Sequence, residues 1–190
     1  MDYEARTGCY RYDVDKFVEH PSLAGAWDGS EFHVHPNARD ADSDVWFVVP
    51  PDAGDPEDAP RTWEALRTKK VAADLHEICA SPVFLEGVAF GDQFTTMTMA
   101  DGIILPTTLV RASGMASGQV WIGENHNERW LPLAVALAAV GCVVDVYSEK
   151  LMGMSWPAAA SDSVADVVNS EAGAGQISWQ WRPSAWRPSA

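Results

Sequence analysis

The chain has 190 residues, 47% of them hydrophobic, and its 27 acidic and 13 basic residues give a formal net charge of −14. This length and composition are typical of one soluble domain with flanking extensions, which buries about 70% of its unfolded surface. The negative field repels phosphate backbones and anionic membranes, so nucleic acid and lipid are excluded as partners and a basic protein is favoured. The alternative is that the charge only keeps the protein soluble or reflects a salt-adapted or high-GC organism.

The cysteines and the apolar segments indicate the compartment. Cys9, Cys79 and Cys142 are widely spaced and form no C-x-x-C pair, so no disulfide framework is implied. The first residues, MDYEARTGCYRYDVDKF, are charged where a secretory signal needs an apolar run, and no stretch approaches the ~20 apolar residues of a membrane span. We therefore expect a cytoplasmic protein.

Residues 1–43 lack sustained periodicity and are rich in turn formers, which predicts a loosely ordered N-terminal arm or one laid over the domain. An α+β domain is expected over residues 44–181. From Asp40 to Asp58 there are seven acids and no Lys or Arg. Within this region the run VWFVV at 45–49 predicts a strand buried on both faces, followed by a solvated acidic loop.

The next segments predict a small curled sheet. TWEALRTKKV and DLHEICA alternate, and in SPVFLEGVAFGDQF an apolar sequence is punctuated by Pro82, Gly87 and Gly91, so the chain bends repeatedly while staying buried. QFTTMTM and IILPTTLV predict a hairpin that turns at Asp101 and Gly102. Pro106 places the second strand at an edge or bulge, and RASGMASG predicts a turn before the short strand QVWIG.

The rest of the domain predicts two helices between strands. For the first helix, Asn127 caps, Pro132 lies in the first turn and Gly141 ends it. Its expected packing face consists of Leu131, Val135, Leu137 and Ala138. CVVDVY at 142–147 then follows as a strand, so a right-handed strand-helix-strand unit is expected.

The second helix is indicated by SDSVADVV, where Ser163 and Asp166 resemble a capping box and Val164, Val167 and Val168 form a stripe. Gly173 and Gly175 end it, and ISWQW is the last strand. The predicted fold is therefore α+β, with a small curled, mainly antiparallel sheet of about six strands followed by a strand-helix-strand-helix-strand unit.

The segment from Trp63 to Asp92 carries a family motif. The pattern W-x-x-x-V, E-x-x-x-I-P-F-F and G-x-x-x-G-D is matched by Trp63, Glu77, Pro82, Phe84, Gly87, Gly91 and Asp92. Val71 follows Trp63 at a longer spacing than the pattern has, and Val83 stands at a position that is usually aromatic. Over Asp44 to Trp181 the chain resembles the bacterial family called domain of unknown function 4265. The resemblance implies a compact α+β domain of bacteria, often actinobacteria, and no known activity, so it transfers no catalytic residue.

The polar residues do not assemble into a reaction centre. His33 and His35 form an H-x-H pair that His20 or Asp40 could extend, but nothing nearby completes a metal site, so we expect neither a metal nor a cofactor. Glu124, His126 and Glu128 precede a helix and are interpreted as caps and dipole partners.

Three further candidates have structural interpretations. Cys79 and Cys142 are expected to be small buried hydrophobes. Asp92 after Gly91 is typical of a turn, and residues 113–118 fit a hairpin turn better than an anion site. Because no nucleophile, base and orienting group converge, no catalytic residue is predicted, and an enzyme ranks third among the function classes.

The last ten residues repeat WRPSA twice, from Trp181 to Ala185 and from Trp186 to Ala190. Proline after arginine disfavours helix at each Arg and favours an extended chain. Among the nine tryptophans, Trp46, Trp63 and Trp179 are assigned to the core. Residues 182–190 form a cationic tail, and the candidate partner-binding residues are Trp181, directly before it, and Arg182, Trp186 and Arg187 within it; the alternative is a tandem duplication or vector-derived end.

The leading functional hypothesis is a non-catalytic protein-binding domain, inhibitor or immunity-like, that acts on a more basic protein partner. The first alternative is a carrier or precursor-like scaffold whose WRPSA repeat is the substrate or recognition tag of a modifying enzyme. In either case residues 182–190 are expected to be dispensable for folding.

Overall fold

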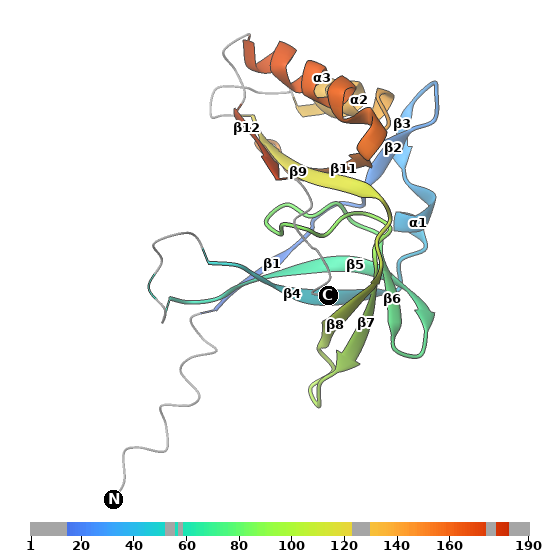
Figure 1. Cartoon of the computed structure of the whole chain (residues 1–190), viewed down its shortest axis with the longest axis vertical. Helices are drawn as coiled ribbons and strands as arrows, with labels where there is room; N and C mark the ends of the chain where they lie inside the picture. The colour runs from blue at the N-terminus through green and yellow to red at the C-terminus, as the bar shows by residue number, and fades with distance from the viewer. Residues whose placement is uncertain (1–14, 52–55, 57–58, 123–129, 174–177, 183–190) are drawn as a thin grey trace, which may run out of the picture.

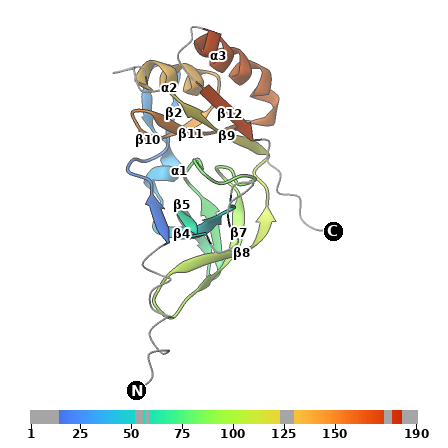
Figure 2. The ribbon, with the colours of Figure 1, turned by 90° about the vertical axis from the view of Figure 1, so that its left-hand side faces the viewer.

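The computed structural model describes residues 15–51, 56, 59–122, 130–173 and 178–182. Two six-stranded sheets are stacked, and helices α2 (Trp130–Ala139) and α3 (Ser161–Gly173) cover the outer face of the second sheet (Figures 1 and 2). Most strand pairs are antiparallel. The predicted α+β class with mainly antiparallel sheets is confirmed.

The first sheet is built around one long strand. Its strands are β1 (Lys16–Glu19), β4 (Ser43–Val49), β5 (Thr62–Ala72), β6 (Leu75–Ile78), β7 (Gln93–Thr98) and β8 (Ile104–Arg111). The first half of β5 lies between β1, which is parallel to it, and β4, whereas its second half pairs with β6. The order then continues through β7 to β8. As predicted, β7 and β8 form a hairpin, and Pro106 lies next to an irregularity in their register.

The second sheet is antiparallel throughout and has the order β12-β9-β11-β10-β2-β3. Its strands are β2 (Gly25–Trp27), β3 (Phe32–Val34), β9 (Met115–Trp121), β10 (Val143–Ser148), β11 (Leu151–Pro157) and β12 (Ser178–Arg182). Strand β11 is an addition to the predicted strand-helix-strand-helix-strand unit. Its sequence LMGMSWP places Gly153 and Ser155, which have low strand propensity, between large apolar residues, so it gives a weak strand signal.

The N-terminal arm is integrated into the fold, which differs from the prediction. Residues 15–43 supply β1 to the first sheet and β2 and β3 to the second, and helix α1 (Pro36–Arg39) follows β3. Each of these strands has only three or four residues, too few to produce a periodic pattern. The partners of β1 and β2, which are β5 and β10, lie far along the chain, and β3 joins the sheet through β2, so only the tertiary fold makes these segments strands.

Two local predictions also need correction. Strand β4 is buried on one face only, because Val45 and Phe47 point inward while Val48 is exposed. Residues 113–118 form no hairpin; Gly114 makes a turn with φ 80° and β9 begins at Met115, so this segment carries the chain from the first sheet to the second.

The helices form where predicted, but the packing face of α2 and the start of α3 differ from the prediction. Helix α2 buries Leu133, Ala134, Leu137 and Ala138, so Leu131 and Val135 were wrongly placed on its packing face. In α3, Val164 and Val168 are buried as predicted, but the helix begins at Ser161 after a 3-10 turn (Ala158–Ala160), so Ser163 is not its cap. The predicted cap of α2, Asn127, lies outside the described residues.

Residues 79–92 form a buried irregular layer between the two sheets, as the predicted repeated bends require. Its side chains Leu85 and Val88 pack with Phe47, Leu66 and Phe94 of the first sheet. On the second sheet the inward face carries small residues, and the Ser155 hydroxyl accepts a hydrogen bond from the Phe90 N–H at 3.1 Å. The opposite face of that sheet buries Met152, Met154 and Trp156 under the helices.

Three buried charged side chains join the two sheets and this layer. His20, directly after β1, contacts Glu64 of β5 through Nε2 at 2.8 Å and Asp145 of β10 through Nδ1 at 3.0 Å. All three side chains are fully shielded from solvent. The Nδ1–Oδ2 contact is an ion pair that lies off the direction of a straight hydrogen bond.

Glu64 also fixes the irregular layer. Its carboxylate accepts backbone N–H bonds from Val83 at 2.7 Å and from Phe84 and Leu85 at 3.0 Å each. Burial is the largest influence on His20 and by itself lowers the pKa, but the hydrogen bonds and charges of Asp145 and Glu64 outweigh it and raise the pKa of His20 to about 10. His20 is therefore protonated at neutral pH.

The substitution Gly153→Ala tests the packing of this layer. A Cβ at Gly153 would lie 2.5 Å from the backbone oxygens of both Ser81 and Pro82, which cannot move aside as a flexible side chain would. We expect the free energy of unfolding, measured with urea, to fall by at least about 2 kcal/mol. Ala100→Ser, in the exposed β7–β8 turn, should change it by less than about 0.5 kcal/mol. Equal stabilities for the two variants would contradict the close approach.

The His20 cluster predicts a pH dependence of stability. Because the folded pKa of about 10 lies above the ordinary value of 6.5, this stabilisation is complete below pH 6.5 and is lost as pH rises toward 10. The free energy of unfolding should fall by a few kcal/mol between pH 7 and 10. In His20→Gln much of this slope should vanish, and stability at pH 7 should be lower.

His76→Gln is the matched control for that experiment. His76 is also buried and bonds the Thr96 hydroxyl at 2.9 Å, but burial lowers the pKa of this ring, so it contributes no loss of stability above pH 7. The variant should keep the wild-type slope from pH 7 to 10. A slope that survives in His20→Gln would show that other groups cause it.

Candidate functional site

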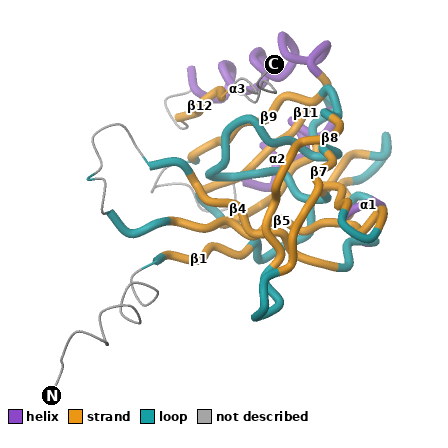
Figure 3. The backbone as a smooth tube through the Cα atoms, turned by 60° about the horizontal axis from the view of Figure 1, so that its bottom comes forward, coloured by secondary structure: helices purple, strands orange, loops and turns teal. Residues whose placement is uncertain are grey.

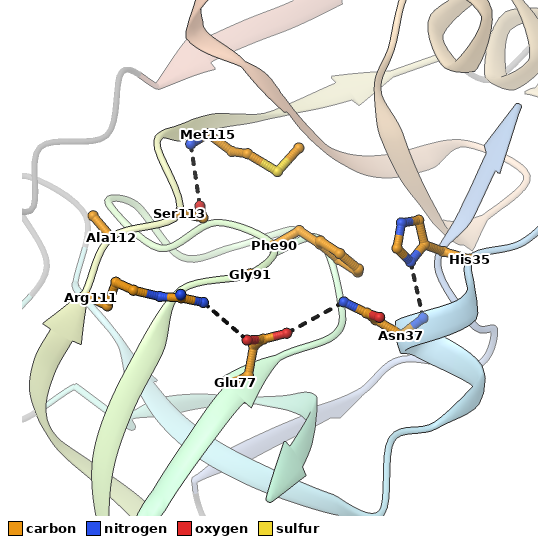
Figure 4. Close-up of a pocket in the computed structure, with 9 residues that line it drawn as sticks. All are labelled: His35, Asn37, Glu77, Phe90, Gly91, Arg111, Ala112, Ser113 and Met115. Carbon is orange, nitrogen blue, oxygen red and sulfur yellow. Dashed lines mark hydrogen bonds and ion pairs between the residues drawn. The ribbon is translucent and has the colours of Figure 1, made fainter. Parts of the chain in front are cut away.

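A pocket of about 430 Å³ opens where the chain leaves the first sheet for the second. It is formed by the end of β8, the start of β9, strand β6, the segment around α1 and the end of the irregular layer. Its lining residues are His35, Asn37, Glu77, Phe90, Gly91, Arg111, Ala112, Ser113 and Met115 (Figure 4). Polar groups and the apolar side chains Phe90 and Met115 face the same space, as in sites that bind amphipathic ligands.

Glu77 supplies the negative charge of the pocket. Its carboxylate accepts hydrogen bonds from Asn37 Nδ2 at 3.4 Å and Gln93 Nε2 at 2.7 Å, and it pairs with Arg111 at 3.3 Å. The Arg111 side chain is 62% exposed, so this ion pair contributes little to stability and can exchange for another cation. Glu77 itself is 17% exposed and therefore stays reachable from the pocket.

Asp92 fixes the backbone next to the pocket residues Gly91 and Ser113. Its carboxylate accepts N–H bonds from Ser113 at 2.7 Å and Ala89 at 2.9 Å. Burial raises the pKa of Asp92, and these bonds oppose the rise. Gly91 before it has φ 84°, and a Cβ there would meet Ser113 Cβ at 3.2 Å. Asp92 is thus a turn residue, in agreement with the sequence interpretation, and it ties the irregular layer to the β8–β9 connection.

His35 contributes a neutral ring. Its Nδ1 accepts the Asn37 N–H at 3.2 Å, capping α1, so in the neutral ring Nε2 carries the proton. The ring packs edge-on against Phe90, with centroids 4.6 Å apart. Burial, followed by the charge of His33, lowers the pKa of His35. The Ser113 hydroxyl accepts the Met115 N–H, and among the described residues no hydrogen bond joins it to His35 or Glu77. The arrangement is suited to binding.

A second candidate site is an aromatic face on the outer side of the first sheet, defined here as Phe17, Trp46, Val48 and Trp63. Register places Phe17 of β1 beside Trp63 of β5, and Trp63 beside Val48 of β4. Figure 3 shows these three strands side by side. The Phe17 ring stacks on Trp63 with centroids 6.5 Å apart and meets Trp46 edge-on at 5.5 Å. Trp46 and Trp63 are therefore half-buried surface residues, whereas the sequence assigned them to the core.

The remaining sequence candidates are dispersed. His20 lies in the buried cluster, His33 is 3.9 Å from Asp28, His35 faces the pocket, and Asp40 pairs with Lys69 at 3.3 Å. No group of three or more potential metal ligands occurs within the described part of the chain. Cys79 and Cys142 are buried as expected, and burial raises the pKa of each thiol to about 12.

The tail residues are placed only in part. The backbones of Trp181 and Arg182 lie in β12, opposite Gly118 and Ser117 of β9. Trp186, Arg187, Trp179's side chain, Cys9 and the predicted caps Glu124, His126 and Glu128 lie outside what the structure describes. None of the described helices is long and apolar enough to cross a membrane.

Sequence reasoning missed the residues that organise both candidate sites. Glu77 was noted only as part of a family pattern, and Gly91 and Asp92 only as bend and turn residues, although Glu77 and Gly91 line the pocket and Asp92 bonds the backbone of Ser113 beside it. Phe17 lies within residues 1–43, which were predicted to be a loosely ordered arm, so it was not considered as a site residue. A usable signal for Glu64 was an acid at an inward position of an otherwise apolar strand segment.

Comparison with known proteins identifies the family but no activity. A search of curated proteins finds no match. The fold is similar to a solved structure titled "Novel crystal structure of a hypothetical protein from Neisseria gonorrhoeae", with a TM-score of 0.57 and 14% identity over 77% of this chain and 99% of that chain. The model of the family described as domain of unknown function (DUF4265) matches residues 64–179. The chain belongs to this family.

Proposed function

We propose that the protein is a non-catalytic binding protein of the bacterial cytoplasm that docks a more basic protein on its aromatic face. The observation that carries the proposal is the exposure of Phe17, 53%, and of Val48, 42%, beside two half-buried tryptophans. Tryptophan and other large aromatic side chains dominate the energetic centres of protein interfaces. A clustered apolar surface on a soluble protein marks an interaction site more often than an isolated exposed residue does.

The aromatic face is held rigid before any partner binds. It lies on paired strands, and Trp63 Nε1 donates a hydrogen bond to Asp15 at 3.1 Å. On the opposite side of β5, the neighbouring residue Glu64 is fixed in the buried cluster. Little conformational entropy is therefore lost when a partner packs against these rings.

Acidic residues next to the aromatic face favour a basic partner. Glu19 follows Phe17 by two positions on β1, so its exposed carboxylate shares the outer face, whereas the exposed Asp44 on β4 lies opposite Arg67 of β5. The chain as a whole carries a charge of −14. Complementary charge around an apolar centre accelerates association and disfavours other partners.

The substitution Phe17→Ser tests this proposal. Partners captured from a bacterial lysate by the wild type are identified, and their affinity is measured with purified proteins. We expect Phe17→Ser to weaken binding of a basic partner at least about tenfold, the scale of an interface aromatic. The association rate should fall steeply from low salt to about 0.15 M, where the screening length is about 8 Å.

Two controls separate a specific interface from general stickiness or charge. Val71→Ser removes a side chain of similar exposure, 50%, at the far end of β5 and should leave binding unchanged. Polylysine should bind wild type and Phe17→Ser equally, because it senses only net charge. Unchanged partner affinity in Phe17→Ser, or a salt-independent association rate, would refute the proposal.

A further inference from the structure

Strand β12 ends beside the first residues of β9, and Met115, the first residue of β9, lines the pocket. Strand β12 runs antiparallel to β9, and its final pair joins Arg182 to Ser117. The next residues of β9 in that direction are Ala116 and Met115, and Met115 lines the pocket. On this edge of β9, no described strand pairs with residues 115 and 116. A continuation of β12 in the same direction would pass Ala116 and Met115 and so approach the pocket.

The segment after Arg182 is suited to leave the sheet and reach this opening. Pro183 has no backbone N–H and cannot continue the ladder with β9. Adjacent strands lie about 4.8 Å apart and each residue rises about 3.3 Å, so Met115, two residues beyond Ser117, is roughly 8 Å from the end of β12. In the extended polyproline geometry the four residues from Arg182 to Trp186 can span about 12 Å, which is enough to reach the pocket.

The chemistry of the pocket matches a tryptophan followed by an arginine. Phe90 and Met115 offer an aromatic ring and a thioether, both of which pack favourably on an indole. Glu77 offers a carboxylate whose present cation, Arg111, is mostly solvated and exchangeable. A guanidinium that enters beside the indole would make a charge-assisted pair with Glu77 and release Arg111 to water.

We infer that the pocket is a binding site for a Trp-Arg peptide segment and that its occupant is the chain's own second repeat unit, Trp186 and Arg187. This contact is separate from the aromatic face and does not depend on the proposed function. It gives the repeat a binding site within its own chain. The alternatives from the sequence were an external partner, a modifying enzyme, or a duplicated or vector-derived end.

Photo-cross-linking of the full chain tests the inference. In Trp186→p-benzoylphenylalanine, light excites the ketone, which abstracts a hydrogen atom from a nearby C–H bond, and the two resulting radicals combine into a C–C bond. We expect the tryptic peptide 112–129, which contains Met115, to be the main partner, at the mass of a single chain. The same amino acid placed at Val71, exposed on the first sheet, should not label this peptide.

Charge variants then test the predicted ion pair. Arg187→Gln, which leaves the folded domain untouched, should lower the yield of this cross-link about tenfold, the effect of losing one charge-assisted bond. Glu77→Gln should lower it similarly, with no further loss in the double variant. Arg111→Gln should raise the yield, because it frees Glu77; since this variant lacks the cleavage site after residue 111, its cross-link is measured in tryptic peptide 71–129.

The inference is overturned if the label at position 186 fails to reach peptide 112–129, or if Arg187→Gln leaves the yield unchanged. A cross-link found only between isotopically light and heavy chains would also overturn it, because the occupant would then be a second copy. Circular dichroism on each variant distinguishes a lost contact from a lost fold.

Discussion

The fold depends on how one carboxylate, Glu64, is kept charged in a place without water. Burying an unpaired carboxylate costs several kcal/mol, so such a group persists only with complete compensation. Here compensation comes from three backbone N–H groups of residues 83–85 and from protonated His20, which in turn is paired with Asp145. Each partner belongs to a different part of the chain, so satisfying one charge fixes the arm, the irregular layer and both sheets relative to one another.

Both candidate sites inherit their geometry from this cluster. Because side chains alternate along β5, an inward Glu64 turns Trp63 outward, where it meets Phe17 from the same short strand that delivers His20. The layer held at residues 83–85 continues to Phe90 and Gly91, which line the pocket. Small inward residues such as Gly153 allow this layer to approach the second sheet closely. A substitution in the cluster of His20, Glu64 and Asp145 would therefore disturb both candidate sites, whereas a substitution at either site leaves the cluster intact.

Local sequence patterns predicted those elements that carry their own turn residues or a clear hydrophobic period. The β7–β8 hairpin, the buried bends of residues 79–92 and the valine stripe of α3 follow from turn chemistry and periodicity. The strands of residues 15–43 could not be found this way, since three or four residues show no period. The cluster joins residues 44 and 81 positions apart along the chain, 20 to 64 and 64 to 145, which no local window contains. Trp46 and Trp63 were wrongly assigned to the core. An apolar strand sequence does not reveal whether one or both faces of the sheet are covered.

The same constraint bears on the proposed binding role, because it commits the titratable groups of the cluster and the pocket to structural contacts. His20, whose pKa is raised to about 10, is ion-paired within the buried cluster and has no access to solvent. The histidine that does face the pocket, His35, uses Nδ1 to cap α1, and the carboxylate beside it already accepts three donors. Groups committed to structural hydrogen bonds cannot exchange protons with a substrate without weakening the fold. Among the described residues, Phe17 and Val48 of the aromatic face stay exposed and the Arg111 side of the pocket's ion pair is solvated, and both properties support the proposed binding of a peptide or protein ligand.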